Sequence, residues 1–175
     1  ILLSLVGSEM CIRDRILTDL NHGIVTLLKQ YKDDSIQDGM DISICLVDKK
    51  TKKVKFSGSR NGIHIVDTDE IYSIKGDLTP VGGYAASHEE SKNRSYQLHE
   101  IELKDNQWVF MYSDGFYDQF GGPRNKSMGS SRFKGIIQEA VTMNKTNAPD
   151  FKNYFFDWMG DEEQIDDVLV IGFKL

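Results

Sequence analysis

The chain has 175 residues, with 27 Asp and Glu against 21 Lys and Arg and a formal charge of −6. A chain of this length can bury a core as one domain, and its acidity argues against a surface that binds the phosphate backbone of nucleic acid. The two cysteines, Cys11 and Cys45, have no spacing typical of a zinc site or of a disulfide framework. We therefore expect a cytoplasmic protein with no nucleic acid among its partners.

The first fifteen residues, ILLSLVGSEMCIRDR, differ in character from the rest. Their apolar run is too short to span a bilayer, which takes about 20 residues, and no basic segment precedes it as in a secretory signal. The stretch has neither helical nor strand periodicity and looks like translated adapter or vector sequence. We expect residues 1–15 to be artefactual or disordered and to make no membrane contact. Residues 16–175 would then form a partial domain that lacks an upstream portion.

Three segments have apolar residues at the three-to-four spacing of an amphipathic helix. The first runs from Ile16 to Tyr31, the second covers 130–141, and the third covers 147–159 with Pro149 suited to its first turn. Strand patterns occur at residues 40–48, 54–59, 62–66, 71–74, 96–103, 108–113 and 168–175. Strands and helices interleaved in this way predict an α+β layered domain.

Two details refine the strand predictions. The lysine-rich turn KKTKK between 40–48 and 54–59 predicts a hairpin. The segment WVFMYS (108–113) is too uniformly apolar for one of its faces to be exposed to solvent, so we expect it at the centre of a sheet. The region 75–95 is rich in Gly, Pro, Ser and charge, which favours a loop.

Carboxylates stand at the ends of two of these apolar strands. Asp114 follows WVFMYS, and Asp166 with Asp167 precedes VLVIG. If the two ends share one rim of a sheet, each pair of charges at 4 Å costs about 1 kcal/mol in water and about 4 kcal/mol at an effective dielectric near 20. A divalent cation such as Mg²⁺ or Mn²⁺ would offset that repulsion. The alternative is structural, because Asp-Gly is a strong turn dipeptide and paired aspartates can simply solvate a loop.

Four separated segments resemble, in order, the PPM-type metal-dependent protein serine/threonine phosphatases. The segments are DGMDISICLVDKKTKKVKFSGS, IKGDLTPVGGY, VFMYSDGFYDQFGG and QIDDVLVIGFKL. The branch is similar to stage II sporulation protein E, and the likeness covers Ile16 to Leu175. It implies a β-sandwich flanked by helices, with two Mn²⁺ or Mg²⁺ ions at one end that activate a water for attack on phosphorus. The implied partners are a phosphorylated regulatory protein, as substrate, and an upstream sensor domain.

The resemblance also implies roles for individual residues. Asp114 and Asp166 would be metal ligands, and no side chain would act as the nucleophile. Asp167, Asp41 and Gly115 would support the ligands without a required metal bond. For Asp41, as for Asp38 in the same DGMD segment, loop solvation or capping is an equally good interpretation.

One part of the family pattern is absent from the sequence. The family has an Asp-x-x-Gly-His-Gly block whose aspartate bridges both metals, whereas the one His-Gly pair here, His22-Gly23, falls inside the first helical stripe without that aspartate. We therefore expect this chain to bind divalent metal weakly and to hydrolyse phosphoserine slowly or not at all, with the full-length product an active phosphatase. Relatives also tend to carry a proline where Gly62 follows Asn61.

Two other functions stay open at this point. A phosphatase-like interaction module that binds a partner without turnover would also account for the missing block. A small calcium-binding β domain is disfavoured, because the sequence has no Asp-x-Asp-x-Asp loop. The histidines His64 and His99 alternate into strands, and we expect both to be ordinary half-exposed residues, since Mn²⁺ and Mg²⁺ favour oxygen ligands.

Overall fold

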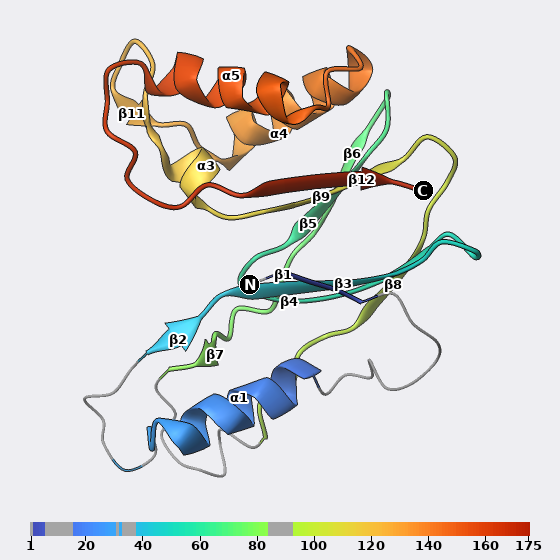
Figure 1. Cartoon of the computed structure of the whole chain (residues 1–175), viewed down its shortest axis with the longest axis vertical. Coiled ribbons are helices and arrows are strands. Elements are labelled where there is room, and N and C mark those ends of the chain that lie inside the picture. The colour runs from blue at the N-terminus through green and yellow to red at the C-terminus, as the bar shows by residue number, and fades with distance from the viewer. Residues whose placement is uncertain (1, 6–15, 31, 33–37, 84–92) are drawn as a thin grey trace. The chain divides into compact units, whose positions relative to one another are not determined.

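The computed structural model describes residues 2–5, 16–30, 32, 38–83 and 93–175. The chain divides into two compact units, Ile1–Gly62 with Lys75–Lys104 and Ile63–Ile74 with Asp105–Leu175 (Figure 1). Each unit contains a four-stranded sheet and at least one helix. The predicted α+β class is therefore confirmed.

The first unit is built on a sheet with the order β1-β3-β4-β8. These strands are β1 (Leu2–Leu5), β3 (Ile42–Asp48), β4 (Lys53–Ser59) and β8 (His99–Glu102). β3, β4 and β8 are antiparallel, while β1 pairs in parallel with β3. A two-stranded sheet of β2 (Gly39–Met40) and β7 (Val81–Gly82) and the helix α1 (Ile16–Leu27) complete the unit.

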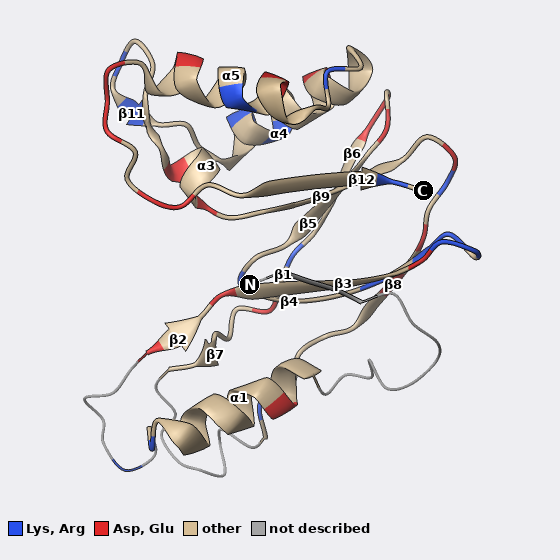
Figure 2. Ribbon diagram, in the orientation of Figure 1, with Lys and Arg blue, Asp and Glu red and all other residues tan. Residues whose placement is uncertain are grey.

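The predicted lysine-rich hairpin is formed by β3 and β4, and its turn is held by Asp48. The Asp48 carboxylate accepts hydrogen bonds from the Lys50 and Thr51 amides at 2.8 and 3.3 Å and from the Thr51 hydroxyl at 2.7 Å. Lys52 adopts a positive φ of 54°, and the blue colour of the basic residues marks the tip of the hairpin (Figure 2). An aspartate at the strand end thus supplies the acceptors that the turn amides need.

Helix α1 packs its apolar stripe against the sheet of the first unit. Leu17 is buried in one cluster with Ile42 and Ile44 of β3. The buried Asn21 side chain accepts a hydrogen bond from the Gly82 amide at 2.9 Å, which joins the helix to β7. The helix ends at Leu27, earlier than the predicted Tyr31, because Lys29 takes a positive φ of 55°.

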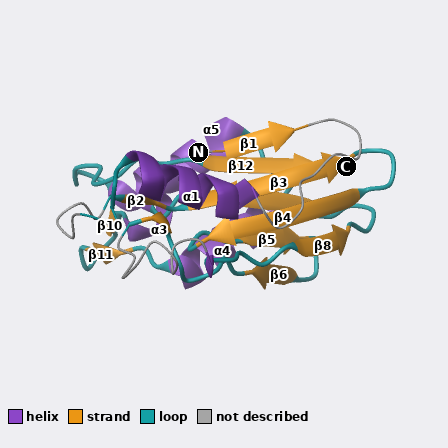
Figure 3. Ribbon diagram, turned by 90° about the horizontal axis from the view of Figure 1, so that it is seen from below, coloured by secondary structure: helices purple, strands orange, loops and turns teal. Residues whose placement is uncertain are grey.

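The second unit is built on an antiparallel sheet with the order β12-β9-β5-β6. The strands are β5 (Ile63–Val66), β6 (Ile71–Ile74), β9 (Trp108–Tyr112) and β12 (Val170–Lys174). Its helices are α3 (Gly115–Asp118), α4 (Ser130–Thr142) and α5 (Ala148–Met159), and β10 (Phe120–Gly121) pairs with β11 (Lys126–Ser127). Figure 3 distinguishes these helices and strands by colour.

An aromatic core joins the helices of the second unit to its sheet. Phe110 of β9 packs against Phe151 of α5, and Phe116 of α3 packs against Phe133 of α4, with ring centroids 5.7 and 4.8 Å apart. Both long helices cover the same face of the sheet (Figure 1). The Asn147 side chain caps α5 by accepting from the Asp150 amide at 3.1 Å.

The strand and terminal-segment predictions have mixed outcomes. The segment 108–113 is central as expected, since β9 lies between β12 and β5. The expectation that the C-terminal strand is buried is wrong, because β12 is an edge strand with half-buried and exposed residues. Leu2–Leu5 form a strand, and residues 6–15 and 84–92 lie outside the described part, so the expectation for residues 1–15 stays a prediction. Within that part, no helix is long and apolar enough to cross a membrane.

Candidate metal centre

Asp114 lies at the end of the central strand β9. Ser113 extends the β9–β12 pairing by one step, as its amide donates to the Leu169 carbonyl at 2.9 Å. Asp114 comes next, is half-buried, and occupies the N-cap position of the short helix α3 without a side-chain capping hydrogen bond. A strand fixed on both sides is a rigid mount for a carboxylate, and such rigidity is what a metal ligand requires.

The loop that leads into β12 lies directly against this strand end. The Ser113 hydroxyl donates to the Asp167 carbonyl at 2.8 Å and accepts from the Leu169 amide at 2.9 Å. A Cβ atom on Gly115 would stand 2.5 Å from the Asp167 carbonyl oxygen and 3.2 Å from Asp166 Cβ. Glycine is therefore needed at 115 for the close approach. The structure brings Asp114 and Gly115 together with Asp166 and Asp167.

A fourth carboxylate, on Asp118, joins this group. Helix α3 places Asp118 four residues after Asp114, so both lie on one side of the helical turn. The pKa of Asp118 is raised, first by partial loss of hydration and then by the negative charges of Asp114 and Asp166. Figure 2 shows acidic residues on α3 and on the loop before β12. Asp118 therefore lies close enough to Asp114 and Asp166 for the charges of both to act on it.

Asp166 and Asp167 are both exposed, but their contacts differ. The Asp166 carboxylate accepts from the Asp167 amide at 2.7 Å, and its carbonyl accepts from the Gln164 side chain at 2.7 Å. Asp167 is held through its backbone carbonyl by Ser113. These bonds fix the loop backbone at the position where the charge of Asp166 acts on Asp118.

Asp41 and Asp38 belong to the first unit and have contacts of their own there. The Asp41 carboxylate lies 3.8 Å from the Arg60 guanidinium, so a basic side chain already offsets its charge. The Asp38 carbonyl accepts from the Gly83 amide at 2.8 Å and from the Gln30 side chain at 2.5 Å. These contacts favour the loop and capping interpretation, and a metal-supporting role for Asp41 stays a prediction.

His22 and His99 lie where the sequence predicts them, whereas the exposure of His64 differs from the prediction. His22 lies in α1 and His99 lies half-buried in β8. His64 was predicted to be half-exposed, but only 3% of it is exposed. Its ring stacks on Tyr112 at 4.7 Å, and burial lowers its pKa to about 4. His64 faces the core because β5 is covered by α4 as well as by its neighbouring strands.

The type of side chain at this site suits a hard divalent cation, but the number of potential ligands is too small. Carboxylate oxygens are the ligands that Mg²⁺ and Mn²⁺ prefer, and the raised pKa of Asp118 shows that negative charge accumulates here. Over the residues that the structure describes, however, no group of three or more His, Cys, Asp or Glu side chains is arranged to hold a metal ion. Asp114 and Asp166 could therefore supply part of a coordination shell.

Asp118 is the site residue that the sequence reasoning missed. Residues 115–118, for which the sequence predicts no helix, form a helical turn. The signal was the D-x-x-x-D spacing of Asp114 and Asp118, which brings two side chains together only if the intervening residues are helical.

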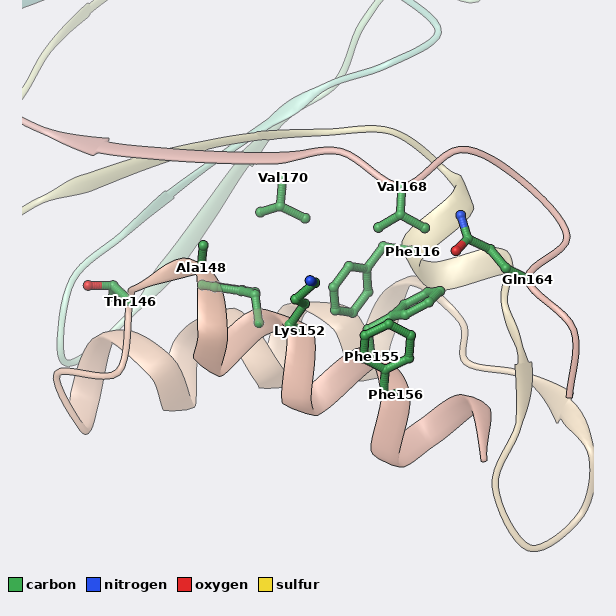
Figure 4. Close-up of a pocket in the computed structure, with 10 residues that line it drawn as sticks. Phe116, Thr146, Ala148, Lys152, Phe155, Phe156, Gln164, Val168 and Val170 are labelled. Atoms are coloured by element: carbon green, nitrogen blue, oxygen red, sulfur yellow. The ribbon is translucent and has the colours of Figure 1, made fainter. Parts of the chain in front are cut away.

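An apolar pocket of about 340 Å³ adjoins the acidic segments within the second unit (Figure 4). It lies between α5 and the chain that leads into β12, and its lining includes Phe116, Phe155 and Val168. Phe116 is two residues from Asp114, and Val168 is two residues from Asp166. The pocket is therefore lined by residues from the two segments that carry Asp114 and Asp166.

Comparison with solved structures identifies the fold. The SiaA-PP2C domain of Pseudomonas aeruginosa superposes with a TM-score of 0.78 at 21% identity, over 93% of this chain and 60% of that one. A bacterial serine phosphatase that carries a single arginine-to-alanine substitution gives 0.60 at 17% identity, over 89% and 62%. The Mn-presoaked phosphatase domain of SpoIIE from Bacillus subtilis gives 0.53 at 17% identity, over 95% and 67%.

No protein-family model and no curated protein matches the sequence. The chain spans about 60% of the length of the SiaA-PP2C domain that it matches. The resemblance carried by the four sequence segments is confirmed at the level of the fold. The chain has the fold of the PP2C-type serine phosphatases.

Proposed function

We propose that the chain carries the Asp114–Asp166 part of a metal-dependent phosphatase site, in a protein that hydrolyses phosphoserine or phosphothreonine on a regulatory protein. The observation that carries the proposal is the close approach of Asp166 and Asp167 to Gly115 at the end of the central strand, where Ser113 bonds both Asp167 and Leu169. The PP2C fold supports it, as does the manganese used with the SpoIIE domain. Mn²⁺ or Mg²⁺ is accordingly the proposed cofactor.

The residues of this chain would bind the cation and fix its position. Asp114, fixed by β9, and Asp166, in the loop before β12, would supply carboxylate oxygens to the cation, with Gly115 and Asp167 in supporting places. When bound, the cation would supply Lewis acidity and an activated water. The pKa of the Asp118 carboxyl group is raised, first by partial loss of hydration and then by the charges of Asp114 and Asp166.

Two carboxylates do not complete a two-metal centre. One or two carboxylates with waters can hold a single Mg²⁺ when substrate phosphates fill the shell, but a stable pair of ions needs a bridging ligand. We propose that an upstream Asp-x-x-Gly-His-Gly segment supplies that ligand in the full-length protein, next to a sensor domain. The 175-residue chain by itself would then be weakly active or inactive.

The test compares the turnover of an aryl phosphate with Mn²⁺ by this chain and by a longer chain that continues upstream of Ile16. We expect the longer chain to be at least about 100-fold faster, since each lost electrostatic element of such a site costs about 10²–10³ in rate. Asp114→Asn in the longer chain serves as the inactive control. Comparable rates from the two chains would show that the upstream block is unnecessary.

A non-catalytic interaction module is the second candidate. The observation in its favour is that the described residues offer no group of three or more metal-ligating side chains. Calorimetric titration of the longer chain with Mn²⁺ separates the two functions. Heat that disappears in Asp114→Asn supports the phosphatase, and no heat at all supports the module.

A further inference from the structure

Asp166 lies in an exposed loop, and the loop needs a support that its own sequence does not provide. Residues 161–167 are all exposed and contain no helix or strand. A loop of this kind opens locally at low cost in free energy. A carboxylate at its centre can hold a cation only if the loop is tied down on both sides.

One side of the loop is held by Ser113, which bonds Asp167 and Leu169. The other side is held by Gln119, a buried residue with no exposed surface. The Gln119 amide nitrogen donates to the Glu163 carbonyl at 2.9 Å, and its amide oxygen accepts from the Ile165 amide at 3.3 Å. Asp166 is therefore bracketed by the two contacts.

Gln119 is itself firmly placed. Its backbone carbonyl accepts from the Trp158 indole and from the Met128 amide, both at 3.0 Å. The second amide hydrogen is used by the Phe120 carbonyl at 3.0 Å. The side chain thus has partners for both donors and for its acceptor, the condition under which a buried polar group gives rigidity at no desolvation cost.

Gln119 is also tied to the other acidic segment, because it follows Asp118 directly and ends helix α3. One residue therefore connects the turn that carries Asp114 and Asp118 to the loop that carries Asp166. We propose that Gln119 is a positioning residue, which sets the distance between the Asp114 and Asp166 carboxylates by holding the 161–167 loop against α3. This inference rests on the proposed metal-binding function but concerns a residue outside the ligand set.

The experiment uses Gln119→Met, which keeps the side-chain volume and removes all three side-chain hydrogen bonds. Gln138→Met is the matched control, since Gln138 lies in the same unit and donates to the Asp67 carbonyl at 2.6 Å, away from the loop. If Gln119→Met does not fold, Gln119→Glu removes the donors but also adds a charge, so for that variant only the amide exchange of the loop decides. Each folded variant is measured by amide hydrogen exchange without metal and by Mn²⁺-dependent water proton relaxation.

We expect amide exchange in residues 162–166 to accelerate at least about tenfold in the Gln119 variant and to stay unchanged in Gln138→Met. Mn²⁺ affinity should fall about tenfold in the Gln119 variant alone, the usual effect of losing a residue that orients metal ligands. A merely structural role would lower the melting temperature of both variants and leave Mn²⁺ affinity alone.

The outcomes distinguish a failure of the proposed role of Gln119 from a failure of the proposed metal-binding function. Unchanged exchange in the loop, or a looser loop with unchanged Mn²⁺ affinity, overturns the role of Gln119. A looser loop in the variant together with no Mn²⁺ binding by the unmodified chain supports Gln119 as the holder of the loop and overturns the proposed metal function.

Discussion

At the scale of single residues, the buried His64 has a pKa that differs strongly from that of a free histidine. Its imidazole is stacked on Tyr112 and lies 6.3 Å from Phe133 between ring centroids. Its Nδ1 atom has no hydrogen-bond partner among the described residues. Burial, and then the charge of Lys134, lower its pKa from 6.5 to about 4. The folded protein therefore keeps this imidazole neutral under conditions in which the unfolded chain protonates it.

The sign of the pH effect follows from that difference. His64 takes up a proton in the unfolded state below about pH 6.5 and in the folded state only near pH 4, so its contribution to stability is complete above pH 6.5 and is lost between 6.5 and 4. The loss is at most about 3 kcal/mol of unfolding free energy. Urea unfolding at pH 7 and at pH 4.5 measures it, with His64→Phe as control because Phe preserves the ring stacking. The same pH dependence in both proteins would rule out His64 as its source.

At the scale of elements, the β10–β11 hairpin depends on its contact with helix α5. A Cβ atom on Gly121 would stand 2.0 Å from the Trp158 carbonyl oxygen, and the Gly122 amide donates to that same oxygen at 2.8 Å. The obstacle is backbone, which cannot move aside as a flexible side chain could. We therefore expect Gly121→Ala to lower the unfolding free energy by about 2 kcal/mol or more.

Gly135 gives the matched control for that substitution. It lies in α4 with no atom within 4 Å of an added Cβ, so Gly135→Ala should raise the unfolding free energy by about 0.5–1 kcal/mol through helix propensity. Urea denaturation of the two variants checks both signs. A neutral Gly121→Ala would mean that β10 does not rest on α5.

The elements that the sequence predicts well are those with long apolar periodicity, such as α4, α5 and β9. The sequence-based predictions are wrong where an element is short or where a segment has contacts that its pattern does not indicate. The strand expected at 96–103 begins only at His99, and Tyr96 joins the α1 cluster instead, its hydroxyl donating to the Pro80 carbonyl at 2.9 Å. The turn α3 was missed because four helical residues are too few to show a period. That omission also concealed Asp118.

In the candidate site, too, features that depend on neighbouring residues in the sequence could be predicted, whereas the tertiary contacts could not. Asp114 and Asp166 could be found because each adjoins an apolar strand and a recognisable motif. The contacts that fix their separation could not be found, since the bonds from Ser113 to Asp167 and from Gln119 to Glu163 join residues 54 and 44 positions apart. Pairings at such separations are set by the fold and leave no periodic pattern in the sequence.

At the scale of the whole molecule, the central claim is that Asp114 and Asp166 act on one cation. Two segments more than fifty residues apart meet at the end of β9, and their charges are both felt by Asp118. Nothing in the hydrophobic core calls for this accumulation of negative charge. Such a concentration of unfavourable charge in an otherwise consistent fold is typical of a functional site.

The most direct test is a double-mutant cycle for Mn²⁺ affinity, measured by water proton relaxation on the chain, on Asp114→Asn, on Asp166→Asn and on the double variant. If both carboxylates bind one ion, each single change should weaken binding about tenfold or more, and the double variant should lose much less than the product of the two, because coupled residues are not additive. Losses that multiply independently, or no Mn²⁺ binding by the unmodified chain, would contradict the claim.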